Sequence, residues 1–222
     1  MISSIKEKAK KELNGRWKEA VNIMVLYIVV SVLITYVGSI NDNYLFVVLG
    51  NILVTGLDLG LIYYFFNFLK HKNDMMNLFE KFGVLYKGLI LFLLKDAYII
   101  IWDALDKLGT YVYDLNINYL TIMYPIVEAL TIILIFIYSL NFALSYFILI
   151  DNPNDSISDI INKSIKIMKD RKIFYLKFIL SFFGLFLISI ITIGIGFLWL
   201  IPYSHISHIF LYKYLKDNND KI

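Results

Sequence analysis

The sequence predicts an all-α integral membrane protein: a polytopic bundle of about six transmembrane helices with two amphipathic helices on the cytoplasmic surface. Of the 222 residues, 59% are hydrophobic and 18% are charged, whereas soluble domains are about 45–50% apolar and about 25% charged. The mean hydropathy is +0.68, and the charged residues gather between long apolar segments. A soluble chain must cover its surface with polar groups, so we expect lipid to surround most of this chain.

The first segment, 1–18, is predicted to be a helix that lies in the membrane interface. Four apolar residues form one stripe at helical spacing, with lysines around it: Ile2, Ile5, Ala9 and Leu13. Such a stripe beside basic residues is typical of a helix at the membrane surface. Arg16 and Trp17 follow, as expected for residues that mark the interface before a first span.

Six apolar segments are predicted to span the membrane, and a helix needs about 20 residues to do so. They lie at about 20–38, 44–69, 84–105, 120–150, 173–193 and 196–214. The segment 120–150 is longer than the hydrocarbon core requires, so its helix should tilt or protrude. The turn around 192–196 is so short that the last two spans should be antiparallel neighbours.

A second amphipathic helix is predicted at 154–172, after the break at Asn152-Pro153. Its apolar side would carry isoleucines and a methionine, and its other side would carry the basic residues Lys163, Lys166, Lys169 and Arg171. Two Ser-x-x-acid patterns also predict helix starts, because a serine and an acid three residues later can cap each other's backbone. They are Ser4 with Glu7 and Ser156 with Asp159.

The positions of Lys and Arg predict the orientation. Apart from Lys95 and Lys107, all of these residues lie in four segments: the N-terminal segment, Lys70 to Lys87, Lys163 to Lys177 and the C-terminal tail. Lys87, Lys177 and Lys213 fall just inside the predicted ends of spans three, five and six. Basic residues favour the cytoplasmic side, so we expect a multi-pass plasma-membrane protein with both termini cytoplasmic. The basic surface helices should contact anionic lipid headgroups rather than nucleic acid, because apolar stripes accompany their charges.

The last third of the chain resembles a family of bacterial multi-pass membrane proteins catalogued as domain of unknown function 975. The likeness is carried by the segments Leu180-Ser181-Phe182-Phe183-Gly184 and Ile193-Gly194-Ile195-Gly196-Phe197-Leu198-Trp199-Leu200-Ile201-Pro202-Tyr203. Matching residues also occur at Ala143-Leu144-Ser145-Tyr146, Asp151-Asn152-Pro153, Lys163-Ser164 and Met168-Lys169, and at the N-terminus at Ile5-Lys6, Ala9-Lys10, Gly15, Trp17 and Ala20.

The middle of the chain departs from the family pattern. Members usually carry Pro-Gly shortly before the Ser-Tyr region, whereas here Pro125 precedes Ile126 and lies farther upstream. The third and fourth spans are also longer and more charged than usual. The resemblance implies a membrane location without an established chemistry, and it places any function specific to this chain in the middle.

Charged residues inside predicted spans are the first candidates for a functional site, because each is costly in lipid. Asp58 and Lys95 lie at the same depth, about 16 Å from the cytoplasmic end of spans two and three. They could pair, with Asp96 beside them. Two interpretations remain open: a buried ion pair that sets helix register, or a site for a proton or cation.

Two further acids are secondary candidates. Asp103 lies on the same side of span three as Asp96, and Glu128 should lie near the outer end of span four. An acidic vestibule there would attract cations or basic peptides. The alternative is that these carboxylates only face water.

His205 and His208 are also secondary candidates, since they lie three residues apart on the sixth predicted helix. Two imidazoles on one face could relay protons or hold a metal together with a carboxylate. The chain has no cysteine and no complete metal-ligand signature. We therefore expect hydrogen-bonded helix contacts there, and neither a metal nor a cofactor.

Gly56 and Gly60 form a Gly-x-x-x-Gly pattern on the second predicted span. This pattern permits close helix contact. It could serve a homodimer or another membrane-protein partner, or ordinary packing within the chain.

The sequence contains none of the common catalytic motifs, such as His-Glu-x-x-His or Gly-x-Ser-x-Gly. We therefore expect no enzyme, and the first hypothesis is a non-catalytic accessory or scaffold component that binds lipid or another membrane protein. The alternative is a small transporter or channel-like protein for a cation, a proton or a basic peptide. A membrane-embedded enzyme acting on lipids is the third hypothesis.

Overall fold

The computed structural model describes residues 1–40, 44–96, 107–111 and 118–219, and within these ranges every regular element is a helix. Four helical stretches are long and apolar enough to cross a membrane: Trp17–Val37, Leu49–Phe68, Met123–Asp151 and Lys172–Ile191. The all-α class and the membrane-compatible helices are thus as predicted. The predicted count of about six is not reached within the described ranges, where four helices meet these criteria.

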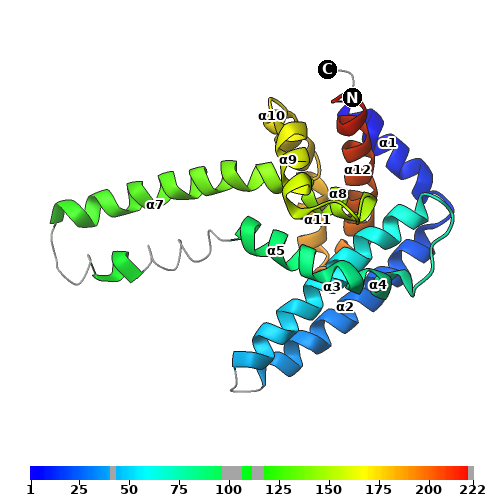
Figure 1. The fold of residues 1–222 in the computed structure, drawn as a ribbon, viewed down its shortest axis with the longest axis horizontal. Coiled ribbons are helices and arrows are strands. Elements are labelled where there is room, and N and C mark those ends of the chain that lie inside the picture. Colours follow the sequence, from blue (N-terminus) through cyan, green and yellow to red (C-terminus); the bar gives the residue numbers. More distant parts are fainter. Residues whose placement is uncertain (41–43, 97–106, 112–117, 220–222) are drawn as a thin grey trace.

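The helices α1 (Ile2–Leu13) and α12 (Phe197–Asp217) pack side by side although they come from opposite ends of the chain (Figure 1). The predicted apolar stripe of α1 is buried at Ile5, Ala9 and Leu13. This stripe therefore packs onto protein, whereas the sequence pattern predicted a helix whose stripe faces lipid.

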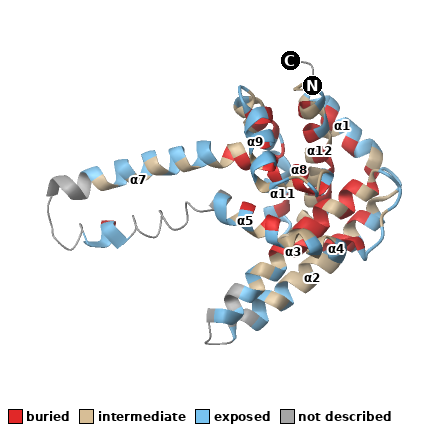
Figure 2. Ribbon diagram, viewed as in Figure 1, coloured by how far each residue is buried: buried red, intermediate tan, exposed pale blue. Residues whose placement is uncertain are grey.

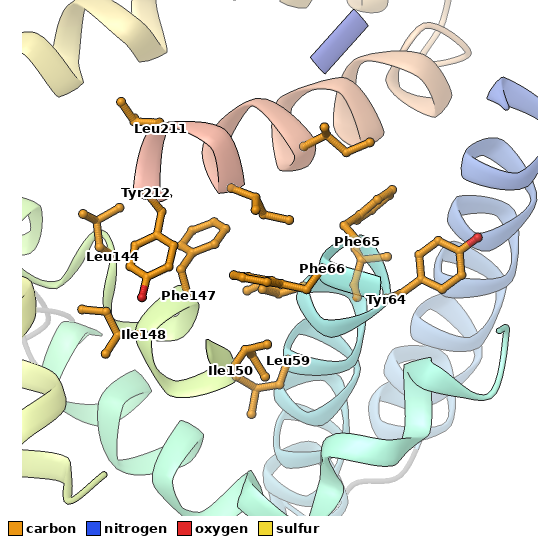
Figure 3. Close-up of a cluster of buried hydrophobic side chains, with 14 of the residues drawn as sticks. Leu59, Tyr64, Phe65, Phe66, Leu144, Phe147, Ile148, Ile150, Leu211 and Tyr212 are labelled. Carbon is orange, nitrogen blue, oxygen red and sulfur yellow. The ribbon is translucent and has the colours of Figure 1, made fainter. Parts of the chain in front are cut away.

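A hairpin of α2 (Trp17–Ser39) and α3 (Tyr44–Phe68) extends away from the α1–α12 pair (Figure 1). Burial is concentrated in the second half of α3, whereas the far end of the hairpin is exposed (Figure 2). Figure 3 shows the core, in which Phe66 of α3 lies near Phe147 and Tyr212. The rings of Phe66 and Tyr212 are 6.3 Å apart, so the core joins α3 to α12.

Three short elements, α4 (Asn77–Glu80), η1 (Lys81–Val84) and α5 (Leu85–Asp96), lie along α3. The buried Lys87 of α5 donates hydrogen bonds to the carbonyl oxygens of Pro153 (2.7 Å) and Asp155 (2.8 Å). This ammonium group therefore ties α5 to the loop before α9.

The apolar segment 120–150 is divided into α7 (Asn118–Ser139), η2 (Leu140–Phe142) and α8 (Ser145–Asp151). Most of α7 extends away from the other described helices, at a marked angle to α2 and α3 (Figure 1), and its apolar side chains are largely exposed. In contrast, α8 is buried at four consecutive residues, from Phe147 to Ile150. The break therefore separates an exposed helix from one that belongs to the core.

The helix α9 (Ile157–Met168) begins with the serine half of the predicted capping box, while the Asp159 carboxylate contacts the Ser156 hydroxyl instead of its backbone N–H. The Asp159 backbone N–H donates to Ser156 Oγ (3.1 Å), and the Ser156 hydroxyl donates to the Asp159 carboxylate (2.6 Å). The matching prediction for Ser4 is wrong, since α1 begins at Ile2 and Ser4 lies inside it.

The helices α10 (Lys172–Leu180) and α11 (Phe183–Ile191) run antiparallel to α12, as the short turn predicted. The pairs of neighbouring rings along this contact are Phe178 with His208, Phe182 with Tyr203, and Phe186 with Phe197. In the turn, Gly194 has φ 85°, a left-handed conformation that glycine adopts without steric cost.

Candidate functional site

Among the predicted site residues, Asp58 makes a direct side-chain hydrogen bond to a neighbouring helix. It lies in the middle of α3, and the Tyr27 hydroxyl of α2 donates a hydrogen bond of 2.5 Å to Asp58 Oδ1. Both side chains are half-buried between the two helices of the hairpin. This places an acid and a phenol together inside two of the membrane-compatible stretches.

The predicted partners of Asp58 lie outside what the structure describes. α5 ends at Lys95 and Asp96, whose side chains are not described, and Asp103 falls in the range 97–106. The Asp58–Lys95 pair and the acidic vestibule therefore stay predictions. Glu128 lies in the first half of α7 and is half-buried.

Tyr27 was not among the site residues predicted from the sequence, which were charged residues, histidines and glycines. The available signal was a phenol in the middle of an apolar segment, where a buried hydroxyl usually finds a hydrogen-bond partner. The sequence does not identify Asp58 as the partner of Tyr27, because which residues meet depends on how α2 packs against α3.

His205 and His208 are packed among aromatic rings. His205 stacks on Phe65 at 5.5 Å between ring centroids, and His208 lies 4.9 Å from Phe178, edge to face. His208 Nδ1 is 2.7 Å from the Ser204 carbonyl oxygen. A carbonyl only accepts, so Nδ1 carries the proton. These contacts are those of a helix packing site, and no three metal-ligating side chains converge in the described ranges.

Gly56 and Gly60 face the chain's own segment 77–84. A Cβ atom added at Gly60 would lie 1.7 Å from the Leu78 carbonyl oxygen, and one at Gly56 would lie 2.8 Å from the Phe82 ring. At Gly60 the neighbour is backbone, so only glycine permits this approach, whereas at Gly56 the Phe82 ring could shift. Contacts within the chain therefore occupy the face that the Gly-x-x-x-Gly pattern offers for a homodimer.

An apolar groove of about 430 Å³ lies between the α1–α2 junction and the α11–α12 pair. Its lining comes from both ends of the chain: Lys10, Trp17, Leu185, Ile188, Ser189, Gly196, Trp199, Leu200 and Tyr203. The Ser189 hydroxyl donates to the Leu185 carbonyl oxygen (2.8 Å) and so is already satisfied. Lys10 is therefore the charged group of an otherwise apolar lining.

Contacts of Lys6 hold α1 in place as one wall of this groove. Its ammonium group donates to the Ser181 carbonyl oxygen (2.7 Å) and lies 4.2 Å from the centre of the Phe182 ring. The Tyr203 hydroxyl donates to the Lys6 carbonyl oxygen (3.3 Å). Partial burial lowers the pKa of Lys6 below its ordinary value. The family-like residues of both chain ends thus meet here.

Arg16 holds the α1–α2 junction, which carries Trp17 into the groove. Its guanidinium donates to the Phe68 carbonyl oxygen (2.8 Å) and to Asn73 Oδ1 (2.6 Å), and it lies 3.6 Å from the centre of the Phe68 ring. Asn73 in turn donates to Glu19 (3.0 Å). The sequence reasoning placed Arg16 at the membrane interface and did not anticipate this network.

The chain belongs to the family described as "Protein of unknown function (DUF975)", whose model matches residues 1–219. The match covers nearly the whole chain and includes every residue that lines the groove. No curated protein and no solved structure matches the chain.

Proposed function

We propose that this member of the family is a non-catalytic accessory protein of the membrane that binds an anionic phospholipid. The acyl chain would occupy the apolar groove, and the phosphate would lie at Lys10. The observation that carries the proposal is a largely apolar groove in which Lys10 is the one charged residue among the described lining residues.

The size and lining of the groove support an acyl chain as its occupant. A volume of about 430 Å³ lies within the range of about 300–1,000 Å³ typical of small-molecule sites. Each methylene group that leaves water for such a lining contributes about 0.8 kcal/mol. Leu185 and Ile188 on one wall and Trp199 on the other offer apolar surface along its length.

The charge at the groove supports an anionic headgroup. Lys10 is exposed, and it makes no ion pair among the residues that the structure describes, whereas Lys11 on the same helix pairs with Glu7 at 3.2 Å. A lysine at an anionic surface contributes about 1 kcal/mol. Trp17 beside it has the amphipathic ring that favours the headgroup level.

The membrane setting of this proposal is the bacterial plasma membrane, with both termini cytoplasmic. Its support is the distribution of Lys and Arg along the chain. Reporter tags on the two ends should both report the cytoplasm, and tags that report opposite compartments would contradict the orientation.

Lipid retention measured by native mass spectrometry tests the function. The full chain is purified in mild detergent from membranes that contain phosphatidylglycerol and phosphatidylcholine. Lys10→Ala should lower the preference for phosphatidylglycerol several-fold, while Lys8→Ala, an exposed lysine of the same helix outside the groove, should not.

A second pair of variants tests the apolar part of the groove. Leu185→Trp should fill it and reduce retention of both lipids, while Leu187→Trp, on the same helix but outside the lining, should not. Equal lipid retention in all variants would contradict the proposal.

The second candidate is a small transporter or channel-like protein for a cation or a proton. The observation in its favour is the Asp58 carboxyl, hydrogen-bonded to Tyr27 between two membrane-compatible helices. Proton flux into liposomes that contain the protein would decide. Transport requires a flux that Asp58→Asn abolishes, and a flux equal to that of empty liposomes excludes this candidate for protons.

A further inference from the structure

A second cavity, separate from the apolar groove, lies where the ends of α8 and α12 meet the middle of α9. Its volume is about 230 Å³. Two isoleucines form part of the wall, and the polar lining residues are Asn152, Lys163, Lys166, Tyr212, Lys216 and Asn219. This basic cavity therefore brings together three lysines from two helices that are distant in sequence.

Carboxylates outside the lining position two of the three ammonium groups. Lys216 Nζ lies 2.7 Å from Asp151 Oδ2, which also accepts a hydrogen bond of 2.8 Å from the Tyr212 hydroxyl. Lys163 Nζ lies 2.6 Å from Asp155 Oδ2. Among the residues that the structure describes, no carboxylate lines the cavity itself.

The charges around the cavity leave one positive charge without a partner. Lys163 and Lys216 are each balanced by an aspartate, whereas Lys166 makes no ion pair within the part of the chain that the structure describes. The side-chain amides of Asn152 and Asn219 make no hydrogen bond to another described residue. The described part of the lining is thus rich in donors and carries a net positive charge.

The two ends of the cavity are held by cations elsewhere in the fold. Arg171 donates to the carbonyl oxygens of Leu215 (2.6 Å) and Asn218 (3.1 Å), which holds the end of α12. Lys87 holds the loop that precedes α9 through the two carbonyl oxygens described above. A site whose walls are already held loses less freedom on binding a ligand.

We propose that the basic cavity binds a phosphomonoester group. Such a group carries between one and two negative charges at neutral pH and several oxygen acceptors, which matches ammonium and amide donors without a carboxylate among them. The volume is below the range of drug-sized ligands, so it accommodates a headgroup rather than a whole lipid. The group could be carried by a soluble metabolite or by a lipid.

Two probes distinguish these sources, both applied to the full-length protein. Titration calorimetry in detergent with sn-glycerol 3-phosphate tests a soluble ligand, with glycerol as the probe that lacks phosphate. Native mass spectrometry from nanodiscs that contain phosphatidic acid among phosphatidylcholine tests a lipid ligand. Binding of the first probe alone assigns a soluble source, and binding of the second alone assigns a headgroup.

Lys166→Gln should weaken binding of the responding probe about tenfold or more, because it removes a charge-assisted hydrogen bond. Lys213→Gln is the matched control, since Lys213 is exposed on α12 and lies outside the cavity. Asn152→Asp should weaken binding without removing a lysine, because it adds a negative charge to the lining. Thermal unfolding checks that each variant folds.

The proposal is overturned if neither probe binds, or if Lys166→Gln and Asn152→Asp bind as the unmodified chain does. Lys10→Ala should leave this binding unchanged, because Lys10 lies in the apolar groove. A failure of the groove hypothesis is therefore distinguishable from a failure of this one.

Discussion

The Tyr27 hydroxyl lies 2.5 Å from Asp58 Oδ1 and donates a hydrogen bond to it across the α2–α3 hairpin. A carboxyl group within a membrane-compatible helix is costly without such a donor. Asp58 lies nearly opposite Gly56 and Gly60 around the axis of α3. The glycines of α3 therefore contact segment 77–84, while Asp58 on the other side contacts α2.

Tyr27→Phe should therefore lower the free energy of unfolding by about 1–3 kcal/mol, because it leaves a half-buried acceptor without this donor. In an Asp58→Asn background the same change should cost less. Unfolding in mixed micelles measures both values. Equal losses in the two backgrounds would show that the charge of Asp58 adds nothing to this hydrogen bond, because an asparagine Oδ1 still accepts from the Tyr27 hydroxyl.

The predicted pairing of Lys95 with Asp58 can be tested by the same comparison of single and double variants. Lys95→Met should lower stability less when residue 58 is already asparagine than when it is aspartate, because the pair is then already broken. Unfolding of the two single variants and the double variant measures the coupling. If the losses simply add, the ion pair predicted from the depth of the two residues does not exist.

Gly60→Ala should lower stability by at least about 1–3 kcal/mol, because its Cβ would overlap the Leu78 carbonyl oxygen. Gly184→Ala is the control, since nothing lies within 4 Å of the added atom. The contact is within one chain, so the loss should not depend on protein concentration. A concentration-dependent loss would point to a dimer through this face.

Replacing both His205 and His208 with alanine should leave the bound-metal content of the purified protein unchanged. The structure places both rings in aromatic contacts, and the Nδ1 proton of His208 is engaged by Ser204. Elemental analysis measures the metal. Stoichiometric zinc that disappears in the double variant would revive a metal site.

Arg16→Lys should lower stability by about 1–3 kcal/mol although it keeps the charge. A lysine cannot make the forked contacts to Phe68 and Asn73 or stack on the Phe68 ring as a guanidinium does. Lys18→Arg is the converse control at a neighbouring exposed position. Unchanged unfolding of Arg16→Lys would mean that the network around Asn73 does not hold the junction.

Local sequence determined the features that depend on residues a few positions apart. Composition indicated lipid as the solvent, because apolar side chains in this proportion cannot all be buried in a chain of this length. The Ser156 cap was predictable because its partner is three residues away. The short turn at Gly194 made α11 and α12 neighbours for the same reason.

Only the tertiary structure decided what each helix face packs against. The stripe of Ile5, Ala9 and Leu13 suits lipid and protein equally, and only the position of α12 shows that protein covers it. The apolar pattern of segment 120–150 likewise did not predict the break between Ser139 and Ser145, after which α8 packs into the core. The hydrophobic effect is non-directional. An apolar pattern in the sequence therefore shows that a helix face is removed from water, but it does not show whether lipid or protein covers that face.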